Sequence, residues 1–330
     1  MDSRIGIIGA GRMGRGIALS YAFAGIPVLM LDIKERTVAE RALLADSVFE
    51  ELRADLSFLA EMNLVDESGI EQVLDRVVLT HSGEDQSSLQ ACGIIFEAVP
   101  EVMAAKMGAF AYISSHADKA AIVASTTSTF LVTALAALVK NPSRFLNAHW
   151  LNPAHLMPLV EISRGDQTSQ AAVDDLVASL ESIDKVPVVC SASPGYIVPR
   201  IQALAMNEAA RLVEEGVASA EDVDKAVKFG FGLRFAVLGL LEFIDWGGGD
   251  ILYYGSEYLS ESVHERFNAP QIIVDNMHNN RNGLRDGKGF YDYSEIDIVA
   301  YRKRRQEDFI ALLNHNKLLP VFDRCKNRDS

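Results

Sequence analysis

The sequence predicts an α/β protein in which a doubly wound, mostly parallel sheet is followed by an all-helical C-terminal domain. Short apolar runs alternate with helical patterns up to about residue 192, and this alternation is typical of parallel sheets covered by helices on both faces. From residue 193 the strand-like runs give way to helical patterns. With 330 residues, 49% of them apolar, the chain is long enough to form two cores. We therefore expect one domain over residues 1–192 and a second over 193–330.

The net charge of the chain argues against two classes of binding partner. A net charge of −14 at pH 7 argues against a nucleic acid and against an anionic membrane surface, because both require a basic face. No apolar run approaches the roughly 18 residues that indicate a membrane span, and the first residues lack the pattern of a secretory signal. We expect a cytoplasmic protein that binds no membrane.

The spacing of cysteine and histidine predicts no metal site. Cys92, Cys190 and Cys325 are odd in number and scattered, which indicates neither a disulfide framework nor a CxxC ligand pair. Several histidines have no metal-like spacing and are expected at the surface, namely His81, His116, His264, His278 and His315.

A glycine-rich turn near the N-terminus predicts a dinucleotide site. An apolar run ending at Ile8 leads into Gly9-Ala10-Gly11-Arg12-Met13-Gly14 and then into a helical pattern, which is the context in which this motif carries meaning. Gly9 allows the tight turn, Gly11 lets the backbone approach a pyrophosphate, and Gly14 lets the helix pack on the strand. The helix N-terminus adds amide donors and a positive dipole.

An acidic residue completes the dinucleotide motif. Asp32 follows the next apolar run, 23 positions after Gly9, where its carboxylate would bind the ribose 2′-hydroxyl. Because a carboxylate repels a 2′-phosphate, the motif favours NAD over NADP. Lys34 and Arg36, just beyond it, leave NADP open.

The next part of the chain predicts a helical hairpin inserted at about residues 37–75, followed by further strands. In a parallel sheet the carboxyl ends of the strands meet at one edge, and ligands bind there. Glu97 to Glu101, the cluster Ser125 to Thr129, and His149 should therefore lie on one rim. The Ser/Thr cluster also fits the cap of the helix that follows, and both roles are compatible.

An imidazole and a carboxylate stand twelve residues apart in the sequence from His149 to Glu161. Phe145 to Trp150 is predicted as a strand, and Pro153 and Pro158 favour a turn before a returning strand that contains Glu161. The turn would bring the two side chains together. A carboxylate bonded to one ring nitrogen leaves the other free to act as a general base. A structural histidine with a satisfied partner is the alternative.

The C-terminal half predicts a bundle of helices. A long helix opens after Ser193-Pro194-Gly195, and further helical patterns continue to about Leu313. Between the last two lies Gly287-Lys288-Gly289-Phe290-Tyr291-Asp292-Tyr293, a glycine turn followed by aromatic residues. An all-helical domain with apolar faces commonly dimerises, so we expect a homodimer.

With these motifs in place, the chain resembles the L-3-hydroxyacyl-CoA dehydrogenase family from Ile5 to about Tyr293. Five ordered motifs carry the resemblance: the glycine turn with Asp32, Phe96-Glu97-Ala98-Val99-Pro100-Glu101, Ser125-Thr126-Thr127-Ser128, His149 with Asn152-Pro153 and Glu161, and the segment from Gly287 to Tyr293.

The resemblance implies a function and a set of site residues. It implies NAD-dependent oxidation of an L-3-hydroxy acid, or its CoA thioester, to the 3-oxo compound, without a metal. His149 is the expected base, Glu161 its partner, and Ser128 touches both the substrate hydroxyl and the nicotinamide. Asn152 is expected to bind substrate. Cofactor contacts are further implied for Glu101, Lys106 and Arg285.

Three departures from the family pattern leave the substrate open. Pro199 stands where the family has an active-site Asn, and the hairpin is acidic where the acyl-CoA enzymes carry lysines. The segment from Gly230 to Gly239 is closer to that of relatives acting on free hydroxy acids, with Arg234 as a clamp for a substrate carboxylate. The alternative is that Arg234 caps a helix or lies on the surface. We therefore keep the thioester, a free small or cyclic hydroxy acid, and a catalytically silent NAD-binding protein as alternatives.

Overall fold

The structure, a computed structural model, describes residues 4–84 and 88–320 and forms two compact units, the first ending at Ala205 and the second beginning at Met206. The division falls within helix α7 (Val198–Glu214), later than the boundary predicted after residue 192. The backbone amide of Val198 donates to Glu161 in the sheet, so the start of α7 belongs to the first unit. No helix in the described ranges is long and apolar enough to cross a membrane.

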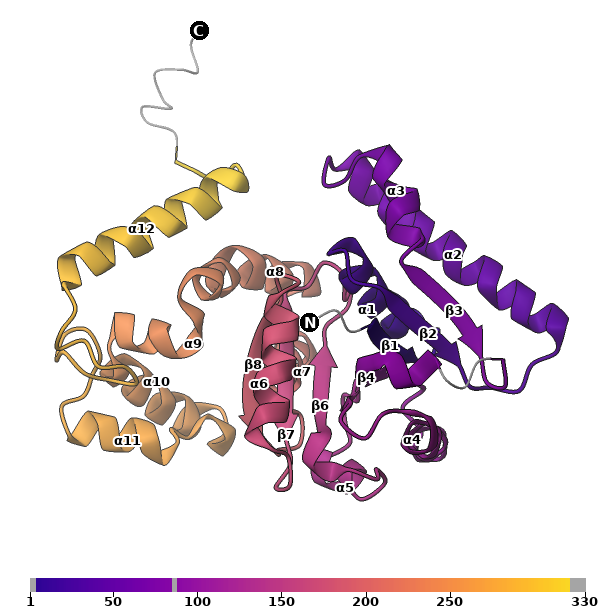
Figure 1. The fold of residues 1–330 in the computed structure, drawn as a ribbon. Coiled ribbons are helices and arrows are strands. Elements are labelled where there is room, and N and C mark those ends of the chain that lie inside the picture. The colour runs from indigo at the N-terminus through magenta and orange to yellow at the C-terminus, as the bar shows by residue number, and fades with distance from the viewer. Residues whose placement is uncertain (1–3, 85–87, 321–330) are drawn as a thin grey trace, which may run out of the picture. The chain divides into compact units, whose positions relative to one another are not determined.

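The first unit is built on an eight-stranded sheet with the order β3-β2-β1-β4-β5-β6-β7-β8 (Figure 1). Neighbouring strands are parallel except β6 and β7, which are antiparallel. The strands are β1 (Arg4–Ile8), β2 (Val28–Asp32), β3 (Val77–His81), β4 (Cys92–Glu97), β5 (Ile122–Ser125), β6 (Phe145–Trp150), β7 (Leu159–Arg164) and β8 (Val186–Ser191). The predicted doubly wound sheet is confirmed.

Helices cover the sheet on both faces. One core cluster joins the sheet to α1 (Arg12–Phe23) and α6 (Gln170–Glu181), and the other joins it to α4 (Met103–His116) and α5 (Val132–Ala136). Strand residues alternate between the two clusters: Ile7 lies in the first and Ile8 in the second. This period of two explains why a strand such as β2 carries apolar residues at successive positions, because both of its faces are buried. Of the cysteines, Cys92 is buried in the second cluster, Cys190 is half-buried, both are free thiols, and Cys325 lies outside the described residues.

The expected helical hairpin is present as α2 (Val38–Glu61) and α3 (Glu67–Leu74), between β2 and β3. Thr37 and Glu40 form a reciprocal capping box at the start of α2. The buried positions of α2, which are Val48, Leu52, Leu56 and Leu59, recur every three or four residues and form one apolar stripe. The hairpin packs on the first core cluster through this stripe and through buried residues of α3, and it exposes its charged face.

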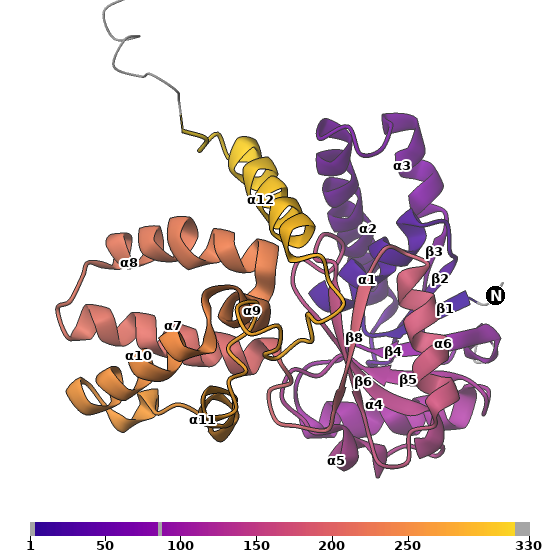
Figure 2. The same cartoon turned by 90° about the vertical axis from the view of Figure 1, so that its left-hand side faces the viewer.

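The second unit is helical, as predicted, and its helices can be followed in Figure 2. They are the remainder of α7, then α8 (Ala220–Ala226), a π-helical turn η3 (Val227–Gly232), α9 (Leu233–Gly247), α10 (Gly249–Ser262), α11 (Gln271–His278) and α12 (Ile298–His315). Helix α9 is broken at Gly239, whose φ of 69° lies in the left-handed region.

Candidate active site

The glycine turn between β1 and α1 has the geometry that a dinucleotide requires. Gly9 has a φ of 110°, and a Cβ on Gly14 would lie 2.1 Å from the carbonyl oxygen of Gly9, so neither position tolerates a side chain. Beside Gly11, by contrast, nothing lies within 4 Å of where a Cβ would stand. The open space at Gly11 lies at the N-terminus of α1, where amide groups face outward. A pyrophosphate fits these residues, with Arg12 exposed and Met13 half-buried beside them.

Asp32 ends β2 in a buried position, with its carboxylate held by the guanidinium of Arg36. Its neighbour is His81, which the sequence led us to expect at the surface. That prediction was wrong: His81 is 7% exposed, and its Nδ1 lies 3.6 Å from the Asp32 carboxylate. The parallel register of β2 and β3 places the two residues opposite each other, and this pairing across the hairpin insertion is invisible in the local sequence.

A buried ion network lies at the carboxyl end of β4. The ammonium of Lys106 is fully buried and donates to both carboxylate oxygens of Glu97, at 3.1 and 3.0 Å, and lies 3.1 Å from Glu101. Ser125, at the end of β5, also donates to Glu97 at 2.5 Å. Three acceptors use the three donors of the ammonium, so a direct contact between Lys106 and a cofactor would require one of these bonds to break.

Glu101 connects this network to the Ser/Thr cluster. Its carboxylate accepts hydrogen bonds from Thr127 Oγ1, from Thr129 N at 3.1 Å and from Thr129 Oγ1 at 2.7 Å. Partial burial alone would raise the pKa of Glu101, but the hydrogen bonds from both threonines and the charge of Lys106 outweigh it and lower the pKa to about 2. The carboxylate therefore stays ionised. Between the two anchored threonines, Ser128 is exposed, and its hydroxyl makes no hydrogen bond to any residue in the described ranges.

His149 and Glu161 face each other across the antiparallel strands β6 and β7, as the spacing predicted. The two residues are register partners, and His149 Nδ1 lies 2.9 Å from Glu161 Oε2. Glu161 is fully buried, and its second oxygen accepts from the amides of Ile197 at 2.9 Å and Val198 at 2.8 Å. These amides at the start of α7 stabilise the carboxylate. His149 Nε2 has no hydrogen-bond partner among the residues described.

The remaining predicted site residues, Asn152, Arg234 and Arg285, are exposed. Asn152 is exposed in the turn after β6. In the second unit, the guanidinium of Arg285 is paired with Asp250 at 3.1 Å and with Asp286 at 3.5 Å. Arg234, at the start of α9, is exposed and forms no ion pair with any carboxylate in the described ranges; it lies over the Phe243 ring at 4.9 Å and donates to the Gly230 carbonyl at 3.3 Å.

Two residues that hold the site in place were missed by the sequence reading. Tyr196 stacks on the His149 ring, and Lys185 binds the turn that follows β6, donating to the carbonyls of Ala154 at 2.8 Å and Met157 at 2.9 Å. The only local signal for Tyr196 was its place after Gly195, and nothing in the sequence points to Lys185. Both contacts join residues more than 25 positions apart.

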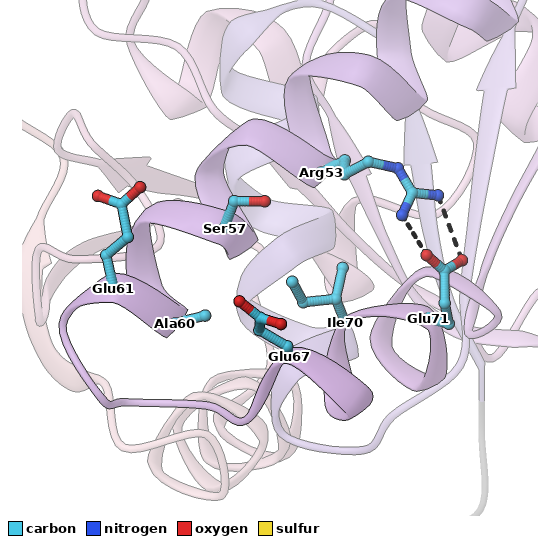
Figure 3. Close-up of a pocket in the computed structure, with 7 residues that line it drawn as sticks. All are labelled: Arg53, Ser57, Ala60, Glu61, Glu67, Ile70 and Glu71. Atoms are coloured by element: carbon cyan, nitrogen blue, oxygen red, sulfur yellow. Dashed lines mark hydrogen bonds and ion pairs between the residues drawn. The ribbon is translucent and has the colours of Figure 1, made fainter.

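A pocket of about 370 Å³ lies on the helical hairpin (Figure 3). Its lining includes Glu61, Glu67 and Glu71 from α2 and α3 but a single cation, Arg53. The guanidinium of Arg53 makes two hydrogen bonds to the carboxylate of Glu71, one of them 3.2 Å long. The pocket is therefore acidic, and its cation is already neutralised.

A glycine turn built for a pyrophosphate, Asp32 at the end of β2, and a buried histidine–carboxylate pair at the same rim define an NAD-dependent oxidoreductase. The family model for the NAD binding domain of 3-hydroxyacyl-CoA dehydrogenase matches residues 4–193, and the model for the C-terminal domain of that family matches residues 195–293. The chain belongs to the 3-hydroxyacyl-CoA dehydrogenase family.

Three similar proteins span most of the chain. The 5-formyl-3-hydroxy-2-methylpyridine 4-carboxylate 5-dehydrogenase of Mesorhizobium japonicum is 29% identical over 94% of this chain and 97% of its own length. A probable 3-hydroxybutyryl-CoA dehydrogenase of Bacillus subtilis is 31% identical over 88% of this chain and 98% of its own. The crystal structure of a 3-hydroxyacyl-CoA dehydrogenase from Archaeoglobus fulgidus is 31% identical, with a TM-score of 0.75 over 96% of this chain and 100% of that one.

Proposed function

We propose that the protein oxidises the hydroxyl of a small free L-3-hydroxy acid to the 3-oxo acid, with His149 as the general base. The observation that carries the mechanism is the pair of His149 and Glu161. Because the carboxylate holds Nδ1–H at 2.9 Å, the lone pair of Nε2 is the one that accepts the hydroxyl proton of the substrate. The exposed hydroxyl of Ser128 orients the substrate. Bound NAD supplies the acceptor for the hydride that leaves the same carbon.

The acidic hairpin supports a free acid over a CoA thioester. CoA carries several phosphate charges that are bound by arginine or lysine where a protein recognises them. The cation of the hairpin pocket, Arg53, is occupied by Glu71, and the remaining ionisable residues of the lining are acidic. Repulsion between these carboxylates and the phosphates disfavours CoA at this surface.

Arg234 supports a substrate that carries a carboxylate. The guanidinium of Arg234 has no carboxylate partner in the described part of the chain, and Arg234 follows a π-helical turn, a local geometry frequent at functional sites. An unpaired guanidinium can bind a carboxylate through two parallel hydrogen bonds. The similarity to a pyridine carboxylate dehydrogenase points the same way. The remaining alternative role of Arg234 is to cap the helix turn at Gly230.

A CoA thioester is the second candidate, and it is favoured by the names of the relatives from Bacillus subtilis and Archaeoglobus fulgidus.

We also propose a cytoplasmic homodimer. The dimer is supported by exposed apolar side chains on α7 and α10, including Met206, Ile251 and Tyr258, each more than half exposed in the single chain. Analytical ultracentrifugation tests the dimer directly.

NADH formation separates the two substrates. The protein is assayed with L-3-hydroxybutyryl-CoA and with a panel of free 3-hydroxy acids, including ring-bearing acids, each with wild type and Arg234→Ala. We expect a free acid to give the higher kcat/KM. Arg234→Ala should lower kcat/KM for that acid, and the decrease should correspond to a loss of about 2–5 kcal/mol of transition-state stabilisation. A thioester preferred by orders of magnitude, with Arg234→Ala unchanged, overturns the free-acid proposal.

His149→Gln tests the mechanism and the silent alternative together. We expect kcat to fall by about 10²–10⁴-fold because the proton acceptor is lost, with NAD binding unchanged. The matched control is His116→Gln, which alters a half-buried histidine on α4. Equal turnover by His149→Gln and wild type would refute the general-base role. NAD binding without turnover of any substrate in the wild type would leave the protein as a silent NAD-binding relative.

A further inference from the structure

The ring of Tyr196 lies flat against the imidazole of His149. The two ring centroids are 5.0 Å apart and the planes differ by 8°. Tyr196 is 6% exposed and has a φ of 45°, following Gly195 with a φ of 75°. A positive φ costs Gly195 little but is unfavourable for a bulky residue such as Tyr196, so this conformation persists only where the surroundings hold it. The backbone is turned sharply here so that the phenol ring can reach His149.

The hydroxyl of Tyr196 reaches the part of the Ser/Thr cluster that lies in the loop after β5. It donates to the carbonyl oxygen of Thr127 at 2.7 Å and accepts from the side-chain amide of Asn147 at 3.0 Å. Asn147 also donates to the carbonyl of Phe130 at 3.0 Å, on the far side of the same loop. The carbonyl that Tyr196 binds belongs to the peptide bond between Thr127 and Ser128. The position of Ser128 is thus tied to the phenol.

The residues directly after Tyr196 contact the third member of the site. The amides of Ile197 and Val198 donate to Glu161, and Glu161 holds the imidazole from its edge. One segment of four residues, Gly195 to Val198, therefore touches the face of the imidazole, the carboxylate at its edge and the peptide of the serine.

We infer that Tyr196 is a positioning residue that sets the distance and angle between His149 and Ser128. The inference rests on the proposed roles of those two residues. The phenol ring prevents the imidazole from tilting away from Glu161, and the hydroxyl fixes the loop that carries Ser128. Because the ring lies over the imidazole, it also favours the cationic form that arises when His149 accepts the proton.

Burial keeps the hydroxyl of Tyr196 protonated. Burial raises the pKa of the Tyr196 phenol far above its ordinary range, against a smaller lowering by the hydrogen bond from Asn147. The hydroxyl therefore remains a donor to Thr127 at neutral pH.

Two substitutions separate the ring from the hydroxyl. Tyr196→Phe keeps the stack and removes the hydrogen bonds; Tyr196→Leu removes both. The structure offers a matched control in Tyr112, which stacks on His116 at 4.1 Å and 22° on helix α4, away from the proposed site. Each variant is assayed with the best substrate of the panel for kcat, for the KM of NAD and substrate, and for the isotope effect of substrate deuterated at the reacting carbon. NMR measures the ring-current shift of the His149 ring protons in the same variants.

We expect kcat to fall about tenfold in Tyr196→Phe and about a hundredfold in Tyr196→Leu, in line with the effect of a misplacement of about 1 Å. The KM of NAD should stay within twofold, the isotope effect on kcat should rise, and the His149 ring-current shift should be lost only in the leucine variant. The partial rescue by phenylalanine distinguishes positioning from mere packing. Tyr112→Phe and Tyr112→Leu should retain full activity.

These measurements distinguish a failure of the positioning role of Tyr196 from a failure of the proposed function. An active wild type whose kcat and isotope effect are unchanged in Tyr196→Leu overturns the positioning role and leaves the proposed function standing. Equal loss in the phenylalanine and leucine variants, with a raised KM for NAD, also overturns it, because that pattern indicates general damage to the fold. A wild type without turnover on any substrate overturns the proposed function, and the role of Tyr196 in catalysis falls with it.

Discussion

A charged group can be kept in a protein interior only where its hydrogen bonds are satisfied, and Glu161 shows how this chain meets that condition. The fully buried carboxylate accepts two backbone amides on one oxygen and the imidazole on the other. Pro199, the residue after these amides, has no N–H of its own, and the first turn of a helix tolerates this. The proline that removes the family's Asn therefore leaves the support of Glu161 intact.

The pH dependence of stability can be predicted for Glu101. Its pKa is about 2 in the folded protein, against 4.5 for an unperturbed glutamate. Since the folded pKa is the lower one, ionised Glu101 contributes stability that is fully present above about pH 4.5 and is lost as the pH falls through about 2. We expect the difference in unfolding free energy between wild type and Glu101→Gln, measured by urea titration, to be constant near neutral pH and to shrink between these limits. A difference that grows on acidification contradicts the assignment.

At the scale of elements, the second unit depends on Asp245, which connects the segment from Gly287 to Tyr293 to helix α9. Asp245 is 2% exposed and accepts from the amides of Phe290 at 3.0 Å and Tyr291 at 2.9 Å and from the hydroxyl of Tyr293 at 3.1 Å. A Cβ on Gly289 would lie 2.1 Å from this carboxylate. The aromatic segment predicted from the sequence is therefore a strap over the end of α9, and the glycine is needed for the close approach.

We expect Asp245→Ala to destabilise the second unit by about 2–4 kcal/mol, because it leaves three donors without their acceptor. Urea unfolding should be followed by the fluorescence of Trp246 in a Trp150→Phe background, since these are the two tryptophans of the chain and each lies in a different unit. The matched control is Asp292→Ala, which removes an exposed carboxylate from the same strap. Equal losses of unfolding free energy in Asp245→Ala and Asp292→Ala would contradict the role given to Asp245.

At the scale of the whole molecule, the cofactor adds stability through binding. The residues predicted to hold NAD from Gly9 to Asp32 all lie in the first unit, so a ligand there stabilises the folded form. At a hundred times its Kd, NAD should raise the unfolding free energy by about 2.7 kcal/mol. NADP at the same concentration should raise it less, because the Asp32 carboxylate repels the 2′-phosphate.

Thermal unfolding with each dinucleotide measures this preference. Asp32→Asn should reduce the difference between NAD and NADP, because it removes the repulsion while keeping the side-chain volume. Arg36, which pairs with Asp32, is then free to meet the 2′-phosphate. Wild-type protein stabilised equally by NAD and NADP rules out the discrimination proposed for Asp32.

Local patterns in the chain were sufficient to predict the order of strands and helices, the glycine turn and the meeting of His149 with Glu161. Each of these depends on residues close in sequence: a helix period, a strand period, or a turn that returns a strand beside the one before it. The twelve-residue spacing from His149 to Glu161 works in this way, since two antiparallel strands and one connection set the register.

Tertiary structure alone decided which side chains from distant segments meet. The burial of His81 against Asp32 depends on the register of β2 and β3, and the stack of Tyr196 on His149 depends on where α7 begins. Both contacts join residues that are more than 45 positions apart in the chain. A pattern of apolar and polar residues records that a position is buried, but it does not record the partner, because the partner is selected by the geometry of the assembled sheet.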